Sequence, residues 1–253
     1  MSALLLAGCQ SIQSSPVEPY SLATLAEEKL FVDPDCTGEQ CAEVRVSALE
    51  FPRREALTKE LRARLMALAP LEGQTTPAGA TPGFAGYADA FFDQARRQGG
   101  PLAGGGASEA LLEADIYARH NDLLVIELNG YTYLDGQAHG LPSTEFMVID
   151  ERQARTVGLD DMLIEGREAA FEALVRDAHQ RWLSELDEGP DMAENWPLTQ
   201  SRNVAPLGNR FVVKYDVYEI APYALGQPEL DIPLEALRGV AKPRYLEGSA
   251  DSE

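Results

Sequence analysis

The sequence lacks the short motifs by which many enzyme sites can be recognised. Its 253 residues contain no nucleophile elbow, no Walker loop, no zincin histidine pair and no dinucleotide-binding glycine motif. Histidine is scarce, and the three histidines are too scattered for their spacing to indicate a site: His120, His139 and His179. We therefore expect no catalytic residue, no metal ion and no cofactor.

Long apolar runs and basic residues are also in short supply. No segment approaches the roughly 18 consecutive apolar residues of a transmembrane helix. There are 21 Lys and Arg residues against 41 Asp and Glu, which gives a net charge of −20. Because such a surface repels phosphate backbones, nucleic acid is not an expected partner. An acidic surface speeds encounter with a cationic partner, although it can also serve solubility alone.

Cysteine occurs only three times, and the first one suggests export. Cys9 follows Leu6-Ala7-Gly8, which resembles the lipobox at the end of a bacterial lipoprotein signal. The preceding apolar stretch is short and has no Lys or Arg, so we expect the true start to lie upstream. Gln10 matches the outer-membrane sorting pattern of Gram-negative lipoproteins. These residues predict an exported, periplasmic lipoprotein, lipidated at Cys9 and anchored in the outer membrane. The alternative is a chance apolar N-terminus.

The other two cysteines lie close together. Cys36 and Cys41 flank Thr-Gly-Glu-Gln, and in an oxidising periplasm they would form a disulfide. Closing so small a ring stabilises the fold by about 2 kcal/mol in the chain-entropy picture. A zinc site is the competing interpretation, but the chain has no second cysteine pair.

The first half of the chain predicts a tether followed by one strand and two helices. Residues 10–35 are predicted to be a flexible tether, since much of this stretch is rich in Ser, Pro and Glu. Apolar residues alternate over 42–49, as in a strand. Leucines at helical spacing predict a helix over 54–68, and aromatic residues and alanines predict a second over 84–95.

The second half has mostly β character. Turn residues separate short alternating segments at 112–119, 123–134, 144–150 and 154–158, which indicates an antiparallel meander. Two further strands are expected at 211–217 and 229–232. A long amphipathic helix over 167–187 lies between the meander and these strands, and His179 is expected to pack at the edge of its apolar face. The loop of about 20 residues after this helix is long enough for a functional segment or a lid. The predicted fold is α+β: a mainly antiparallel sheet with helices packed on one face.

Two blocks of sequence resemble the RsiV/PdaC-like periplasmic domain family. The first block is residues 131–163, YTYLDGQAHG…TEFMVIDERQARTVGLDDML. In it a strand enters a loop in which the family has Gly-Gly-Ala-His and this chain has Gly136-Gln137-Ala138-His139, and the next strand leads through a turn to a short helical segment. The second, FVVKYDVYEIAPYALGQPELDIPLEAL at 211–237, is similar to the closing motif of that family through Tyr218-Glu219-Ile220, Pro222-Tyr223 and Gly226. The resemblance covers 110–240 as an RsiV-like C-terminal part. It covers 36–109 only by arrangement, as a PdaC-like α+β part, and 241–253 is expected to be a frayed tail.

The resemblance implies a binding domain rather than a complete signalling protein or enzyme. RsiV-like proteins are membrane anti-sigma factors whose outer domain binds lysozyme, and PdaC-like proteins carry a polysaccharide deacetylase. Within these 253 residues we find neither the sigma-binding segment nor the deacetylase metal domain. The expected ligand is a cationic muramidase such as lysozyme, or peptidoglycan glycan, bound in an inhibitory, immunity or sensing role. A purely structural envelope lipoprotein remains an alternative.

The candidate ligand contacts come from the two matching blocks. They are Tyr131, Tyr133, Asp135, His139, Tyr218, Glu219 and Tyr223. His139 admits two interpretations. The glycines Gly136 and Gly140 favour a tight turn in which His139 is structural. In the other interpretation, His139 faces a cleft beside Glu219 or Asp135 and catalyses a reaction on envelope glycans.

Overall fold

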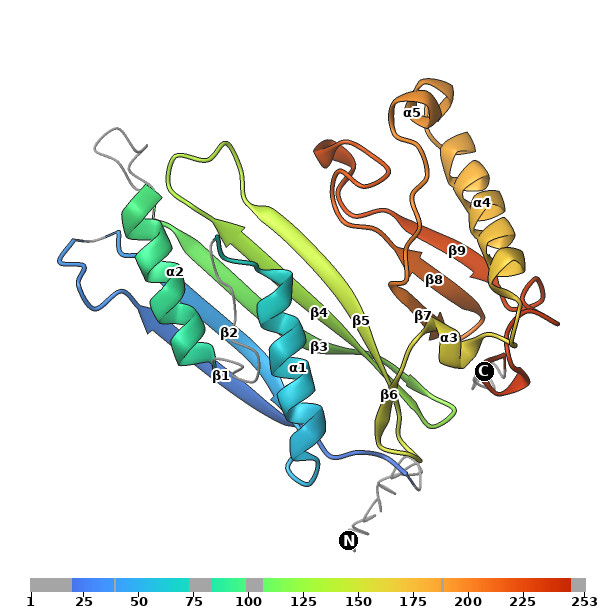
Figure 1. Ribbon diagram of the computed structural model, residues 1–253, viewed down its shortest axis with the longest axis horizontal. Helices are drawn as coiled ribbons and strands as arrows, with labels where there is room; N and C mark the ends of the chain where they lie inside the picture. Colours follow the sequence, from blue (N-terminus) through green and yellow to red (C-terminus); the bar gives the residue numbers. More distant parts are fainter. Residues whose placement is uncertain (1–19, 39, 73–82, 99–106, 188, 247–253) are drawn as a thin grey trace, which may run out of the picture.

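The described residues form two β-sheets joined side by side (Figure 1). The computed structural model describes residues 20–246 except 39, 73–82, 99–106 and 188. The first sheet contains, in spatial order, β1 (Leu25–Val32), β2 (Glu43–Glu50), β3 (Glu109–His120), β4 (Leu123–Tyr133), β5 (Leu141–Asp150) and β6 (Arg155–Val157). The second contains β7 (Val204–Leu207), β8 (Arg210–Lys214) and β9 (Glu229–Pro233). All neighbouring strands are antiparallel except β2 and β3, which are parallel. The predicted α+β fold with a mainly antiparallel sheet is confirmed.

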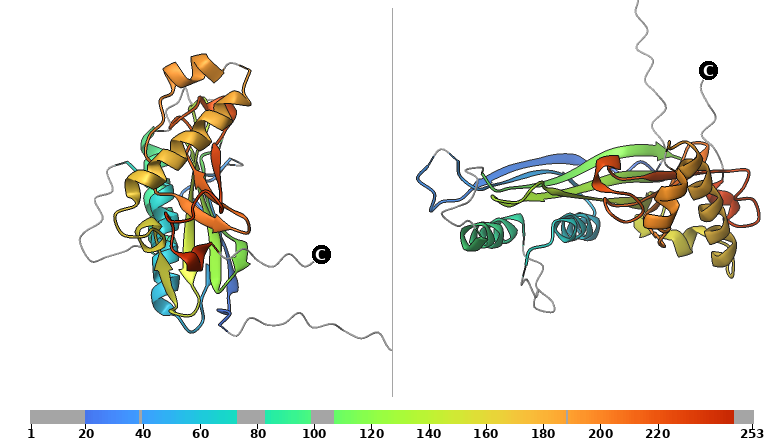
Figure 2. Two further views of the ribbon diagram at one scale, coloured as in Figure 1. Left: turned by 90° about the vertical axis from the view of Figure 1, so that its right-hand side faces the viewer. Right: turned by 90° about the horizontal axis from the view of Figure 1, so that it is seen from above.

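Two helices cover one side of the first sheet. They are α1 (Glu55–Leu68) and α2 (Phe84–Gln98), and Figure 2 shows both on the same side. The leucine stripe predicted for the first helix is buried against the sheet at Leu57, Leu61 and Leu65. Strand β2 meets it with Val44 and Val46, because alternate residues of a strand point to one face. This face holds one of the two hydrophobic cores.

The second sheet carries the remaining helices. These are α3 (Leu159–Met162), α4 (Glu168–Ser184), α5 (Gly189–Asn195), η1 (Tyr223–Leu225) and η2 (Pro243–Tyr245). The apolar face of α4 contributes Phe171, Val175 and Ala178 to the second core. Strand β4 belongs to both cores, since Leu124 faces α1 and α2 while Val125 faces the second sheet. Alternation along one strand therefore joins the two halves.

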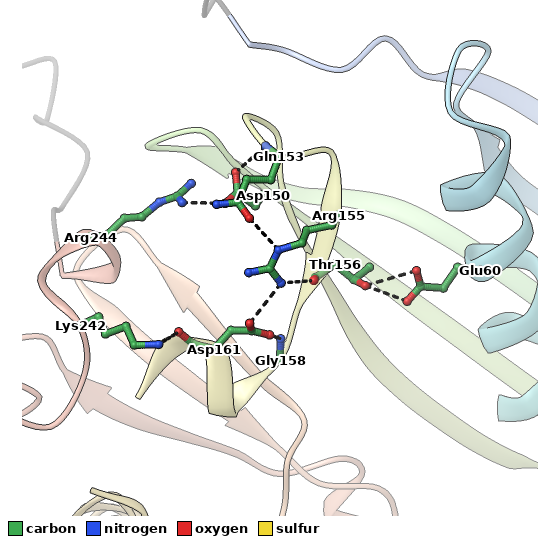
Figure 3. A network of polar contacts seen from close by, with 9 residues as sticks. All are labelled: Glu60, Asp150, Gln153, Arg155, Thr156, Gly158, Asp161, Lys242 and Arg244. Atoms are coloured by element: carbon green, nitrogen blue, oxygen red, sulfur yellow. Dashed lines mark hydrogen bonds and ion pairs between the residues drawn. The ribbon is translucent and has the colours of Figure 1, made fainter. Parts of the chain in front are cut away.

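A polar network also joins the two halves where β6 ends (Figure 3). The carboxylate of Asp161 in α3 accepts from the backbone N–H of Gly158 at 3.0 Å and forms an ion pair with Arg155 at 3.1 Å. These bonds hold the pKa of Asp161 below its ordinary value. Nearby, Arg244 reaches the fully buried carboxylate of Asp150 at 2.6 Å. The last described residues are thereby fixed to the end of β5.

Several expected boundaries differ from the structure. Residues 25–32, expected within the tether, form β1, an edge strand whose charged Glu27, Glu28 and Lys29 hide its alternation. Part of the expected frayed tail is ordered, with Tyr245 buried in η2. The expected long loop after α4 contains both α5 and β7, and β7 is only four residues long. The elements that were not predicted are those whose apolar residues show little helical or strand periodicity.

The predicted disulfide is confirmed between Cys36 and Cys41, with a Sγ–Sγ distance of 2.03 Å. It closes the loop between β1 and β2. Cys9, the expected lipidation site, lies outside the described residues. Within the described ranges, no helix has both the length and the apolar composition needed to cross a membrane.

Candidate functional site

Three of the seven predicted contact residues meet in an aromatic cluster. The His139 ring, from the loop between β4 and β5, stacks on Tyr223 of η1 with ring centroids 4.0 Å apart. Its Nε2 lies 3.0 Å from the hydroxyl of Tyr218, and its Nδ1 lies 3.0 Å from the carbonyl oxygen of Gly140. Trp196, which sequence reasoning missed, stacks beside Tyr218 with centroids 6.2 Å apart. We call His139, Tyr218, Tyr223 and Trp196 the aromatic cluster.

These hydrogen bonds show how the His139 ring is held. A carbonyl oxygen can only accept, so Nδ1 donates to Gly140, and in the neutral ring Nε2 accepts from the Tyr218 hydroxyl. Both ring nitrogens are used, one of them by the loop's own backbone. Of the acids considered as catalytic partners, Glu219 instead accepts from the backbone N–H of Asp216 at 2.7 Å. The geometry is that of a turn residue which also supports an exposed tyrosine.

Tyr218 is held in a backbone conformation that few side chains adopt. Its φ is 68°, in the left-handed region, and the residue is 44% exposed. The flanking chain is fixed by the carboxylate of Asp216, which accepts from the backbone N–H of Thr144 at 2.8 Å and from Gln227 at 2.9 Å. A strained backbone maintained by its surroundings is a common feature of functional loops. Tyr218 is therefore an exposed candidate for a contact residue.

The two predicted strand tyrosines lie beside this cluster. In the sheet register, Tyr131 is opposite Leu111 and Tyr133 is opposite Glu109. Burial raises the pKa of Tyr131, and the nearby groups of Glu109, Tyr223 and Tyr133 raise it further. The loop crosses closely over Tyr131 at Gly140, where a Cβ atom would lie 2.1 Å from the ring. The aromatic cluster and the outer surface of the sheet are therefore continuous.

That outer surface is acidic. We call the side of β1–β3 that points away from α1 and α2 the open face, and Figure 2 shows no described element lying over it. Its carboxylates follow from strand alternation: Glu28, Glu43, Glu109, Glu113 and Asp115.

Only part of this charge is neutralised. Arg45 points to the open face and forms an ion pair with Glu43 at 2.6 Å. Among the described residues, no ion pair reaches Glu109, Glu113 or Asp115. A depression of about 440 Å³ has two acids and two bases among its lining residues: Glu28, Glu113, Lys29 and Arg45. The uncompensated carboxylates make this face suited to a cationic ligand.

Of the other predicted contacts, Asp135 lies in the loop after β4, and its backbone N–H donates to the hydroxyl of Ser108 at 3.0 Å. Sequence reasoning missed the acids of β3. Their signal was present in the alternation of Glu109, Glu113 and Asp115 with buried Ala110 and Leu112. Only the parallel pairing of β2 with β3 shows that they share a face with β1 and β2.

Comparison with known proteins identifies related chains without an assigned activity. The family described as "Protein of unknown function (DUF3298)" matches residues 160–235. The crystal structure of a DUF3298 family protein from Pseudomonas aeruginosa PAO1 is 32% identical, with a TM-score of 0.76, covering 90% of this chain and 98% of that one. A DUF3298 member from Bacteroides fragilis NCTC 9343, at 18% identity and a TM-score of 0.67, shares the fold, with 88% and 95% of the two chains covered. A comparison with curated proteins finds no match.

Proposed function

The chain belongs to the DUF3298 family, and we propose that it is a binding protein whose open face and aromatic cluster receive a cationic protein of the lysozyme class. The observation that carries this proposal is the row of uncompensated carboxylates that runs toward exposed aromatic rings. The resemblance of residues 131–163 and 211–237 to RsiV/PdaC-like domains supports lysozyme as the ligand. Bound in this way, the protein would inhibit a muramidase, confer immunity to it or sense it.

Charge and aromatic rings contribute differently to such an interface. Carboxylates such as Glu113 and Asp115 attract a basic partner over a distance and raise the association rate. Exposed rings such as Tyr218 provide contact area and can accept a lysine or arginine over their faces. We therefore expect the acids to determine the association rate and its salt dependence. Tyr218 should mainly determine the dissociation rate.

The proposal includes the location of the protein. Lipidation of Cys9 would hold the domain at the periplasmic side of the outer membrane, where lysozyme-class enzymes reach peptidoglycan. Mass spectrometry of the mature protein from a Gram-negative host should detect acylated Cys9. An unmodified N-terminal segment in the soluble fraction would contradict this part.

The binding test uses a soluble chain that begins at Tyr20 and so keeps β1. Its association with lysozyme is followed by surface plasmon resonance from about 50 to about 500 mM NaCl, a range over which screening becomes strong. We expect the association rate to fall steeply with salt. The double variant Glu113→Lys/Asp115→Lys should lower that rate at least about tenfold at low salt.

The matched control makes the same change of charge elsewhere. Asp177 on α4 and Glu235 after β9 are exposed and lie outside the open face. The variant Asp177→Lys/Glu235→Lys should keep most of the association rate. If both double variants lose binding equally, net charge rather than the open face is responsible. Absence of binding at low salt would eliminate lysozyme as the ligand.

A further inference from the structure

A second concave site lies on the opposite half of the molecule, outside the open face. It is a groove of about 490 Å³ between α4 and residues 197–202, which follow α5. Its apolar lining comes from Leu159, Leu163, Phe171, Val175, Leu183 and Leu198. Sites for small molecules have volumes of about 300–1,000 Å³ and mostly apolar walls with a few polar groups. The groove has the size and the walls of such a site.

Its most unusual polar group is His179. The residue lines the groove and is only 6% exposed, with its ring stacked on Trp182 at a centroid distance of 5.8 Å. The Nε2 atom is buried and has no hydrogen-bond partner in the described part of the chain. Since most buried polar groups are paired, an unpaired nitrogen on a residue that lines a groove is an uncommon feature. Burial lowers the pKa of His179, so the neutral ring offers one donor and one acceptor.

Three of the charged groups that line the groove already have partners within the protein. Arg202 forms an ion pair with Asp160 at 2.6 Å, and Gln200 donates to Glu172 at 2.7 Å. The first contact ties the segment 197–202 to α3, and the second ties it to α4. Two further charged residues that line the groove, Glu168 and Arg176, are exposed. An ion that enters the apolar floor would lose its hydration, which is unfavourable.

We propose that this groove binds a small uncharged molecule with an aliphatic body and one hydroxyl or carbonyl group, which hydrogen-bonds the imidazole of His179. The aliphatic body would lie along Phe171, Val175 and Leu198. The site is independent of the proposed function, because none of its lining residues belongs to the open face or the aromatic cluster.

The test is a titration of the full chain with 1-octanol, followed by tryptophan fluorescence, since Trp182 stacks on His179. Octanoate and octylammonium serve as charged probes with the same number of carbon atoms. We expect saturable binding of 1-octanol and at least about tenfold weaker binding of both ions, because each must be desolvated. Equal binding of all three probes, or no saturable signal with 1-octanol, would overturn the proposal.

Two variants separate the hydrogen bond from the cavity. His179→Phe keeps a ring but removes the nitrogens, and it should weaken binding of 1-octanol about fivefold, the effect of one neutral hydrogen bond. Val175→Phe fills the groove and should abolish binding. The control Asp177→Asn changes an exposed residue of the same helix and should bind normally. Unchanged affinity in both His179→Phe and Val175→Phe would show that the octanol binds elsewhere.

Discussion

At the scale of single residues, His139 shows how a suggestive side chain can be mainly structural. Its predicted role in a tight turn agrees with the hydrogen bond from Nδ1 to the carbonyl of Gly140. The turn also requires Gly140, which lies directly against the ring of Tyr131. The sequence alone showed two glycines around a histidine, but not that the Tyr131 ring packs against Gly140.

Gly140→Ala should therefore destabilise the protein by about 1–3 kcal/mol, the usual cost of overpacking. The added Cβ would meet the Tyr131 ring at 2.1 Å, so the ring or the loop must move. Urea denaturation measures the loss. Gly158→Ala is the control, because nothing lies within 4 Å of its added Cβ. Tyr131→Ala should relieve the clash in the double variant. If the losses of stability from Gly140→Ala and Tyr131→Ala simply add in that variant, this explanation is wrong.

His179 leads to a prediction about pH. Burial lowers its folded-state pKa below the ordinary 6.5, so between these two values only the unfolded chain binds the proton. Stability should fall as pH decreases below about 6.5, by about 1.4 kcal/mol per pH unit until the folded-state pKa is reached. His179→Phe lacks this loss. The Tm of the variant minus the Tm of the native protein should therefore become more positive as the pH falls from about 7.5 to about 5. A constant difference in Tm across this range would contradict the prediction.

At the scale of elements, side chains take the place of a missing strand along the outer edge of β5. Strand β6 pairs only with residues 148–150 of β5. Beyond that point, Asn203 accepts from the backbone N–H of Phe146 at 2.8 Å and donates to the carbonyl of Thr144 at 2.7 Å. Asp216 satisfies the N–H of Thr144. These side-chain bonds act in addition to the shared hydrophobic core that attaches the second sheet to the first.

Asn203→Ala should lower the free energy of unfolding by about 1–3 kcal/mol, because it leaves backbone groups of β5 unpaired. Chemical denaturation provides the measurement. Asn209→Ala is the control, because Asn209 is exposed and, within the described residues, only its backbone carbonyl accepts a hydrogen bond, from the N–H of Leu234. The substitution keeps that backbone bond. That variant should change stability by less than about 0.5 kcal/mol. Equal effects of the two substitutions would show that the Asn203 bridge adds nothing.

At the scale of the whole molecule, the two cores share the strands β4 and β5. Residues of opposite parity along these strands enter different cores, as Ile126 and Val125 do. Lys214 of β8 adds an ion pair to Glu127 of β4, with Nζ and Oε1 2.5 Å apart. Neither half can lose its packing without exposing one face of the same strands.

We therefore expect the protein to unfold in one cooperative transition. Both tryptophans, Trp182 and Trp196, lie in or just after the helices of the second half, so their fluorescence reports that half. Far-ultraviolet circular dichroism reports both sheets. The two signals should give the same midpoint in urea. Separate midpoints would show that the halves unfold independently.

The sequence by itself determined the local structure wherever the pattern was strong. The leucines of α1, the aromatic residues of α2 and the alternation along β4 each specify one face, since hydrophobic spacing follows helix or strand geometry. The short loop between Cys36 and Cys41 likewise determined the disulfide. The blocks around His139 and Tyr218 indicated which loops belong together.

Only the tertiary structure decided which residues share a surface. β1 is a charged edge strand and β7 is four residues long, so neither has enough periodicity to be recognised alone. The parallel pairing of β2 with β3 joins segments some 60 residues apart and places Glu113 beside Ser47. Trp196 reaches Tyr218 only because α5 returns the chain toward that loop. Such contacts depend on long-range packing, and local sequence patterns carry no information about it.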